Sequence, residues 1–339
     1  MATYKGIQGY SVENLTSDPS PTGNYVGQLW YNSTTGAYKI ATEATGVWAS
    51  ANAIPANRGN AGACGTTTAA LYVGGSEPAP PLNNALEFDG TNWSIGGTLT
   101  QNSSRVHTSF TAGTQTAGLV GGGGGGTSPT ATSEEYNGTS WAAGGTMTRP
   151  APSCKGGSIG GTQAAALACA SDVSPFKTVE SYDGTSWTAG TDTTSTHARA
   201  MGSQIGTQTA CLCVGAEENP TAAYTEEWNG SSWTEKGDLN TGRGIGGSGG
   251  TTTAGLVFAG HFYSVPTGQV KYASTEKFDG TSWTEVGDIA AAKSYVYGCG
   301  TQGAALLAGG VTGPSSTPNS TTAEVWTDPI ETTKTVTVS

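Results

Sequence analysis

Apolar positions along this chain fall in short runs bounded by glycine and by polar segments rich in Thr and Ser. The most regular run is a hexapeptide that begins with an aromatic residue, continues through Asp-Gly or Asn-Gly, and ends in Trp. It occurs as Phe88–Trp93, Tyr136–Trp141, Tyr182–Trp187, Trp228–Trp233 and Phe278–Trp283. The copies begin 48, 46, 46 and 50 residues apart, and a partial copy follows at 324–326. A period of this length predicts one ring or solenoid of repeated units.

Each repeat contains four segments with the composition of short β-strands. The first follows a basic residue and ends in Gly-Thr, and the second is apolar and ends in small residues, as in Ala70–Gly75. The third carries the aromatic residue of the hexapeptide, and the fourth carries its Trp. The Asp-Gly or Asn-Gly between them accepts positive φ at both turn positions and favours a tight hairpin. The pattern therefore predicts sheets of four antiparallel strands.

The two ends of the repeated region are incomplete in complementary ways. The last repeat has no fourth strand after residue 326, whereas Gly46–Trp48 has the pattern of a fourth strand without the first three. Pairing these segments would remove the two open sheet edges of the ring. We therefore predict an all-β fold, a six-bladed β-propeller over 45–328, in which residues 45–52 complete the last blade.

The segments outside the ring predict a small accessory sheet. Residues 1–44 are interpreted as an N-terminal attachment segment, with a hairpin over 28–40 around a turn at 32–36. Residues 329–339 alternate with β-branched side chains and predict a C-terminal accessory strand. We expect this strand to pair with the hairpin.

The repeat resembles the kelch repeat of β-propellers. Its glycines at the end of strand two and its aromatic-Asp-Gly-to-Trp hairpin carry the resemblance, which covers about residues 57–326. Together with the segment 27–36, these repeats look like kelch-type structural proteins of tailed bacteriophages, especially marine phages. That resemblance implies a non-enzymatic virion protein, such as a tail fibre, a tail appendage or a capsid-surface protein.

Charge and hydropathy exclude several other classes. The net charge is -11 without any cluster of Lys or Arg, which disfavours nucleic acid as a partner. No run of 18 apolar residues exists for membrane insertion. Residues 1–9 lack the apolar core of a secretory signal. We expect synthesis in the host cytoplasm and localisation in the virion.

One basic residue recurs at the start of each repeat. These residues are Arg58, Arg105, Arg149, Arg199, Arg243 and Lys293. A glutamate recurs two positions before the strand-three aromatic, at Glu134, Glu180, Glu226, Glu276 and Glu324, and Leu86 replaces it in the first repeat. The basic residues could form a ring that holds an anion, or each could pair with the glutamate of its own repeat. We favour the structural pair, because a partner of opposite charge is already present.

No catalytic, cofactor-binding or metal-binding residue is predicted. The three histidines, His107, His197 and His261, occupy unlike positions in their repeats. The six cysteines, Cys64, Cys154, Cys169, Cys211, Cys213 and Cys299, lack the spacing of metal ligands and are interpreted as small buried thiols. A carboxylate pair for glycoside hydrolysis stays open as an alternative, because its separation is not visible in sequence.

The segments between strands two and three differ most between repeats. They are Glu77–Asn84, Gly122–Thr132, Glu217–Tyr224, His261–Ala273 and Val311–Thr322. They should emerge on one face of the ring and bind a host-surface glycan or protein. Aromatic residues that could serve there as sugar platforms, or pack in the interior instead, are Trp30, Tyr31, Tyr263, Tyr295 and Tyr297.

The expected partners are other virion proteins, contacted through residues 1–40 in an oligomeric assembly. Two alternative functions stay open beside this one. The first is a propeller that acts on or binds glycans, and the second is a cellular kelch protein that binds other proteins.

Overall fold

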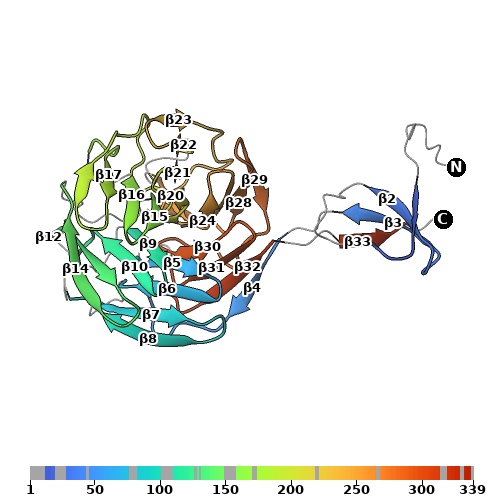
Figure 1. Ribbon diagram of the computed structural model, residues 1–339, viewed down its shortest axis with the longest axis horizontal. Coiled ribbons are helices and arrows are strands. Elements are labelled where there is room, and N and C mark those ends of the chain that lie inside the picture. Colours follow the sequence, from blue (N-terminus) through green and yellow to red (C-terminus); the bar gives the residue numbers. More distant parts are fainter. Residues whose placement is uncertain are drawn as a thin grey trace. The chain divides into compact units, whose positions relative to one another are not determined.

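The computed structural model describes residues 12–19, 28–42, 46–75, 82–100, 110–125, 128–129, 131–148, 158–169, 174–217, 221–264, 268–313, 319–328 and 332–336. All regular secondary structure in these ranges is β (Figure 1). They belong to two compact units, one formed by 1–46 with 328–339 and the other by 47–327. The described residues contain no helix that is long and apolar enough to cross a membrane.

The larger unit consists of antiparallel sheets of four strands that follow one another along the chain. The first two sheets are β5 (Gly62–Thr66), β6 (Ala69–Val73), β7 (Asn84–Phe88) and β8 (Trp93–Thr98), then β9 (Phe110–Thr114), β10 (Ala117–Gly121), β13 (Thr132–Tyr136) and β14 (Trp141–Thr146). The next two are β15 (Ser158–Thr162), β16 (Ala165–Cys169), β17 (Val179–Tyr182) and β18 (Trp187–Ala189), then β20 (Gly206–Thr207), β21 (Ala210–Val214), β22 (Thr225–Trp228) and β23 (Trp233–Glu235).

The last two sheets are β24 (Gly247–Thr251), β25 (Ala254–Phe258), β28 (Thr275–Phe278) and β29 (Trp283–Val286), then β30 (Tyr297–Gly300), β31 (Ala304–Ala308), β32 (Ala323–Thr327) and β4 (Val47–Ala51). Figure 1 shows the sheets around a ring, with the first strand of each nearest the centre. This arrangement is consistent with a β-propeller. The prediction of four-stranded antiparallel sheets is confirmed for five of these six sheets, and the sheet of β15–β18 carries β19 (Ser203–Gln204) as a fifth, parallel strand.

Two short hairpins lie within the segments that join strands two and three. They are β11 (Gly124–Gly125) with β12 (Ser128–Pro129), and β26 (His261–Ser264) with β27 (Gly268–Lys271). The second hairpin fills most of the segment 261–273, which the sequence pattern had presented as a variable loop.

The repeated hexapeptide forms the outer hairpin of each sheet. Its aromatic residue and its Trp are direct partners across the hairpin, as in Phe88 and Trp93, whose ring centroids are 4.7 Å apart. Asp89 Oδ1 accepts the backbone N–H groups of Thr91 and Asn92 at 2.8 and 2.6 Å. Of the two turn residues, only Gly90 has positive φ, at 95°. The prediction of positive φ at both turn positions was therefore wrong. The Asp side chain closes the turn through its own hydrogen bonds instead.

The tryptophans connect each sheet to the preceding one. Trp283 Nε1 donates to Thr225 Oγ1 at 2.9 Å, and Trp233 Nε1 donates to the carbonyl of Thr191 at 2.8 Å. A buried indole N–H needs an acceptor. The repeated Trp therefore fills the space between neighbouring sheets, and its hydrogen bond sets their distance.

The sequence places a glutamine directly after several Gly-Thr turns, and this residue forms a second connection. Gln115 Nε2 donates to the carbonyls of Ala70 and Phe88, at 3.2 and 2.9 Å, in the sheet before its own. Equivalent bonds are made by Gln163, Gln208 and Gln302. This Gly-Thr-Gln signal is visible in the sequence, although its role depends on the neighbouring sheet.

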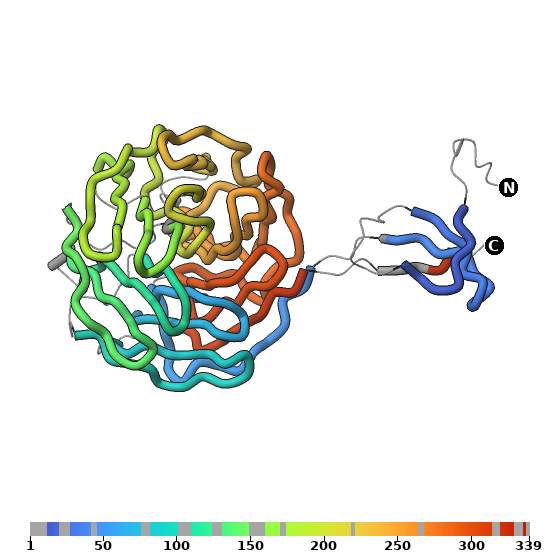
Figure 2. Tube along the Cα trace, viewed as in Figure 1, coloured from blue at the N-terminus to red at the C-terminus, as the bar shows by residue number. Residues whose placement is uncertain are grey.

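The N-terminal strand β4 completes the sheet of the last repeat. It pairs with β32 in antiparallel register, and Trp48 lies opposite Trp326. Figure 2 shows the blue segment that contains β4 beside the red segment that contains β32. Trp48 Nε1 donates to Thr275 Oγ1 at 2.9 Å in the preceding sheet, which is the bond that a hexapeptide Trp makes elsewhere. The predicted pairing of residues 45–52 with the last repeat is confirmed over Val47–Ala51.

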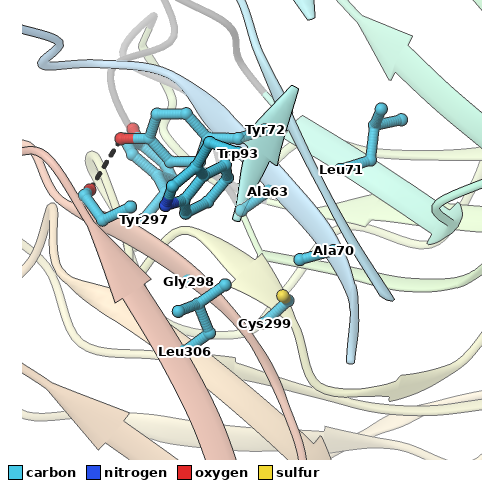
Figure 3. Close-up of a pocket in the computed structure, with 10 residues that line it drawn as sticks. Ala63, Ala70, Leu71, Tyr72, Trp93, Tyr297, Gly298, Cys299 and Leu306 are labelled. Atoms are coloured by element: carbon cyan, nitrogen blue, oxygen red, sulfur yellow. Dashed lines mark hydrogen bonds between the residues drawn. The ribbon is translucent and has the colours of Figure 1, made fainter. Parts of the chain in front are cut away.

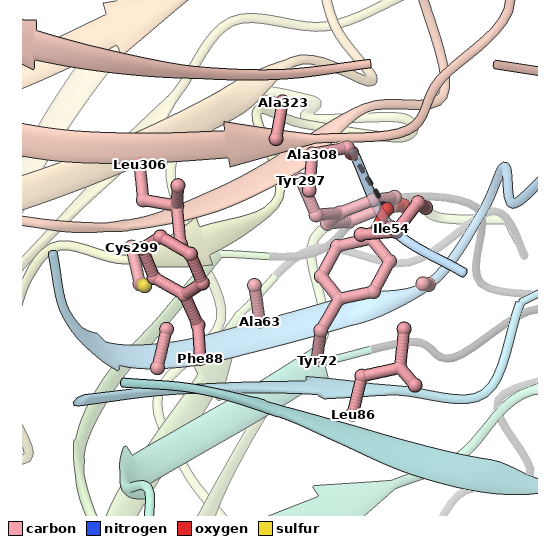
Figure 4. Packing of buried hydrophobic residues seen from close by; sticks show 12 residues of the cluster. Ile54, Ala63, Tyr72, Leu86, Phe88, Tyr297, Cys299, Leu306, Ala308 and Ala323 are labelled. Atoms are coloured by element: carbon pink, nitrogen blue, oxygen red, sulfur yellow. Dashed lines mark hydrogen bonds between the residues drawn. The ribbon is translucent and has the colours of Figure 1, made fainter. Parts of the chain in front are cut away.

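The first and last sheets of the ring also pack against each other. Tyr72 of β6 donates its hydroxyl to the carbonyl of Ala308 in β31 at 2.7 Å (Figure 4). In Figure 3, Tyr72, Trp93 and Tyr297 line a space between these sheets. That space has no room for a water molecule. The junction is therefore a packed core and not a ligand site.

The smaller unit is a sheet of β1 (Glu13–Leu15), β2 (Leu29–Asn32), β3 (Ala37–Thr42) and β33 (Thr332–Thr335). Strand β33 pairs with β3, so the C-terminal strand joins the N-terminal hairpin as expected. Asp18 accepts hydrogen bonds from Trp30 Nε1 and Asn32 Nδ2 at 3.1 and 2.7 Å, which anchors the segment before β2.

Candidate functional site

Three of the repeated basic residues are committed to their own sheets. Arg58 is buried and donates to the carbonyls of Gly74 and Asn84, at 2.8 and 2.9 Å. Arg243 is buried against the Glu276 carboxylate, and Lys293 Nζ donates to Glu324 Oε1 at 3.1 Å. The predicted structural pair is thus confirmed for Arg243 and Lys293. Arg105 and Arg149 lie outside the described residues.

The fourth repeat departs from this scheme. Its glutamate, Glu226, accepts a hydrogen bond from His197 Nε2 at 2.9 Å, and His197 Nδ1 lies 3.0 Å from the carbonyl oxygen of Gly215. His197 therefore occupies the place that Arg243 and Lys293 hold in the following repeats. The prediction that Arg199 is their equivalent was wrong.

Backbone geometry gives the correct alignment of the fourth repeat. Arg199 has a φ of 54°, which matches 59° at Asn60, 53° at Ile245 and 53° at Tyr295. Each of these three residues lies two positions after the structural basic residue of its repeat. Two extra residues in the fourth repeat restore the usual interval between Arg199 and its Gly-Thr turn. Spacing alone therefore gave no sign of the shift.

The extra chain lies at the centre of the ring. Strand β19 (Ser203–Gln204) runs parallel to β15 and lies against β5, β9, β24 and β30. Ser203 Oγ accepts a hydrogen bond from the backbone N–H of Gly298 at 3.2 Å. Protein therefore fills the place where a ring of cations could have held an anion.

The Arg199 guanidinium takes part in a separate polar group, which we call the Arg199 cluster. Its members are Arg199, Glu217, His261, Gln269 and Tyr295. Glu217 Oε2 accepts from Arg199 Nη1, and Glu217 Oε1 accepts from His261 Nε2 at 2.8 Å. The His261 and Tyr295 rings are 5.1 Å apart, and the Tyr295 hydroxyl accepts from Gln269 Nε2 at 2.7 Å.

The cluster is held by the backbone as well as by its side chains. Ile245 N–H donates to the carbonyl of Arg199 at 3.2 Å, and Tyr295 N–H donates to the carbonyl of Ile245 at 3.0 Å. The backbone N–H of Tyr263 in β26 donates to the carbonyl of Glu217 at 3.0 Å. Residues from three successive repeats are thereby fixed together.

Electrostatics define the charge state of Glu217. Burial raises the pKa of its carboxyl, but the hydrogen bonds and electrostatic interactions with His261 and Arg199 together outweigh burial, so the pKa is lowered. Glu217 is therefore an anion at neutral pH, and His261 must carry its proton on Nε2. Burial, together with the negative charge of Glu217, raises the pKa of Tyr295 to about 12, so its hydroxyl stays protonated.

Two buried polar atoms of the cluster have no hydrogen-bond partner in the described part of the chain. They are His261 Nδ1 and Gln269 Oε1. His261 is 0% exposed. A buried acceptor without a partner costs free energy, so such an atom calls for a specific explanation.

The other predicted candidates lie elsewhere. Trp30, Tyr295 and Tyr297 are buried, Tyr31 is half-buried beside Tyr38, and Tyr263 is 52% exposed. His107 and Cys154 lie outside the described residues. Within the described ranges no group of three His, Cys, Asp or Glu side chains could hold a metal ion.

The described cysteines match the interpretation as buried thiols. They are Cys64, Cys169, Cys211, Cys213 and Cys299, all free and buried. Burial raises the pKa of Cys64 and Cys299, which keeps these thiols protonated and unreactive.

Sequence comparison finds no relative that could assign a role. No protein-family model matches the chain, and a search of curated proteins found no match. Among solved structures, one titled "Structure of YjhT" superposes with a TM-score of 0.67. The alignment covers 84% of this chain and 99% of that chain at 12% sequence identity. At this identity the likeness concerns the fold alone.

Proposed function

We propose that the larger unit is a closed six-bladed, kelch-like β-propeller within a non-enzymatic structural protein of a phage virion. The protein would be a tail fibre, a tail appendage or a capsid-surface protein, and its propeller would present a binding surface to a host receptor or to another virion protein. The resemblance of the repeats to phage kelch proteins supports the virion assignment.

The observation that carries this proposal is that segments from both sides of the repeated region pair in one small sheet. Strands β3 and β33 lie on opposite sides of the repeated region in the sequence, and they pair with each other. Their sheet belongs to a compact unit distinct from the ring. A unit that is separate from the repeats is suited to attachment, because the repeated unit can then present its loops. Residues 1–40 would contact other virion proteins.

The ring has the properties of a rigid display scaffold. Arg58, Arg243 and Lys293 are bonded within their sheets, and Trp and Gln side chains connect each sheet to the preceding one. Binding residues are commonly placed on loops that such a scaffold holds. The segments between strands two and three are therefore the proposed binding surface.

A cryo-EM map of the assembly that contains this chain tests the proposal. The expected map has residues 12–42 and 332–336 packed on other virion subunits, with six blades in the ring and the segments between strands two and three facing solvent. A free monomer, or a different blade number, would contradict the corresponding part of the proposal.

A further inference from the structure

The two faces of the smaller sheet, formed by β1, β2, β3 and β33 (Figure 1), differ in how they are covered. Trp30, Asn32 and Ala41 share one face, because direct partners and alternate residues of a strand project together. These three residues are 3%, 4% and 4% exposed. Asp18 lies at this face and accepts hydrogen bonds from Trp30 and Asn32. The protein's own chain therefore covers this face.

The opposite face is apolar and open. Its side chains belong to two pairs of direct partners, Leu29 with Ile40 and Tyr31 with Tyr38. The two tyrosine rings are 5.2 Å apart, and Tyr38 is 45% exposed. The other three side chains are half-buried. A sheet buries an apolar face by packing it against a second layer, so this face calls for a partner.

The charged residues of the sheet do not favour an ionic partner at the open face. Glu13 and Lys39 are both in register with Trp30, on the covered face. In the described part of the unit, Lys334 is the one charged residue in register with the open face, and it belongs to the edge strand β33. The rim of an interface stays in contact with water, so a lysine there is compatible with an apolar centre. The matching surface is therefore another apolar face.

The smaller unit is also small for an independent core. It comprises only residues 1–46 and 328–339, fewer than the ~70–80 residues at which a single hydrophobic core usually suffices. All six cysteines of the sequence lie in the larger unit, so no disulfide can staple the smaller one. Its described residues contain no group of three side chains that could hold a metal ion. Oligomerisation is the other common way to stabilise a domain of this size.

The distribution of charge indicates where two copies of the chain can meet. The larger unit carries 11 basic and 20 acidic residues, a net charge of -9. The smaller unit carries three basic and five acidic residues, a net charge of -2. Like charge keeps the larger units of two copies apart, whereas the open face of the smaller unit has no such barrier at its centre. An apolar face can also pack on its own copy, as a twofold interface requires.

We propose that the open face of the smaller sheet, formed by Leu29, Tyr31, Tyr38 and Ile40, binds the same face of a second copy of this chain. The two sheets pack face to face across a twofold axis, about 10 Å apart, with their tyrosine rings interdigitated. This inference deepens the proposed function, because it names one subunit that the attachment unit contacts. It rests on that function for the place of the dimer in the virion.

Sedimentation velocity of the full chain, at concentrations from about 1 to 100 µM, tests the inference. The expected result is a dimer whose fraction rises with concentration. Tyr38→Asp places a charge at the centre of the interface and should raise the dissociation constant by about tenfold or more. Tyr263→Asp is the matched control, because it changes a tyrosine that is 52% exposed in the larger unit and should leave the dimer unchanged.

Side-chain footprinting of the native chain makes the test independent of how the variant folds. Hydroxyl radicals modify accessible tyrosine rings, and mass spectrometry measures the modification at each one. Tyr31 and Tyr38 should lose reactivity as the dimer forms, whereas Tyr263 should keep it. A chain that begins at residue 12 should dimerise with the same protection.

Four results would overturn the inference. They are a native chain that stays monomeric at every concentration, a Tyr38→Asp variant that dimerises like the native chain, a dimer in which Tyr31 and Tyr38 stay reactive, and protection of these tyrosines that is lost in the chain beginning at residue 12. The last result would assign the open face to the first residues of the same chain.

The virion proposal is tested separately, by the subunits that contact residues 12–42 in the cryo-EM map. A purified monomer whose residues 12–42 contact a different protein in that map would refute the second copy and support the proposed function. A dimer with the expected protection, in a chain that belongs to no virion, would support the second copy and refute the proposed function.

Discussion

The fourth and fifth repeats carry nearly the same pattern of residues and use it differently. In the fifth repeat Arg243 is buried against Glu276, and the residue two positions later is the apolar Ile245. In the fourth repeat His197 replaces that arginine, and Arg199 follows two positions later at the same backbone geometry. The comparison shows that a histidine hydrogen bond takes the place of the buried arginine beside the repeated glutamate.

The largest effect should come from removing the buried cation of the fifth repeat. Arg243→Ala leaves the Glu276 carboxylate buried without its charge partner, which should lower the free energy of unfolding by about 3–5 kcal/mol. Urea denaturation measures this change. Lys236→Ala is the control, because it breaks a pair with Glu227 whose side chains are 29% and 23% exposed. A loss below about 1 kcal/mol for Arg243→Ala would refute the structural role.

A smaller loss is expected from the histidine of the fourth repeat. Glu226 accepts backbone hydrogen bonds from Thr194 on Oε1 and from Ser195 on Oε2, both at 2.9 Å, so each oxygen keeps a donor when His197 is removed. In Glu276 the donors of Asn240 reach Oε2 and Arg243 reaches Oε1. His197→Ala should lower the free energy of unfolding by about 1–3 kcal/mol in the same assay. A loss equal to that of Arg243→Ala would mean that the backbone donors contribute little.

Acid should act on the same carboxylate. Burial raises the pKa of Glu226, but the hydrogen bonds from His197, Thr194 and Ser195 lower it from 4.5 to about 2. A depressed carboxyl pKa stabilises the folded state above the unfolded-state pKa, and this stability is lost as pH falls from 4.5 toward 2. Stability measured against pH should show that loss in the native chain. Glu226→Gln should lack this component, and an unchanged profile in the variant would contradict the assignment.

The smallest effect is expected for Arg199. Its side chain is 36% exposed, and solvent screens its charge, so Arg199→Ala should lower the free energy of unfolding by less than about 1 kcal/mol. A stability loss as large as that of Arg243→Ala would show that both cations are structural, and the distinction between the two repeats would fall.

Most of the fold could be predicted from the sequence because its signals are local. The aromatic residue and the Trp of each hexapeptide are five residues apart, and a two-residue Asp-Gly or Asn-Gly follows the aromatic residue, so the hairpin is visible within a short window. The pairing of β4 with β32 was predictable for a different reason. Each segment lacked the partner that the repeat requires, and an unpaired sheet edge is unfavourable.

The candidate site was not predictable in the same way. Arg199 has the expected residue type at the expected distance from its Gly-Thr turn, and His197 appeared to be an isolated histidine. Tyr263 was one of five aromatic candidates, and burial alone separates it from Tyr295 and Tyr297. Glu217 and His261 lie 44 residues apart, and no local pattern joins them.

The sequence by itself determined the strands, their hairpins and the order of the sheets, because these depend on neighbouring residues and on a period that repeats. The tertiary structure alone decided which cation pairs with Glu226 and what fills the centre of the ring. It also brought Tyr263 next to Glu217. The physical reason is that these features depend on contacts between different repeats. Two extra residues between His197 and Gly206 displace the chain toward the strands of other sheets. Only the contacts with those strands determine where each side chain lies.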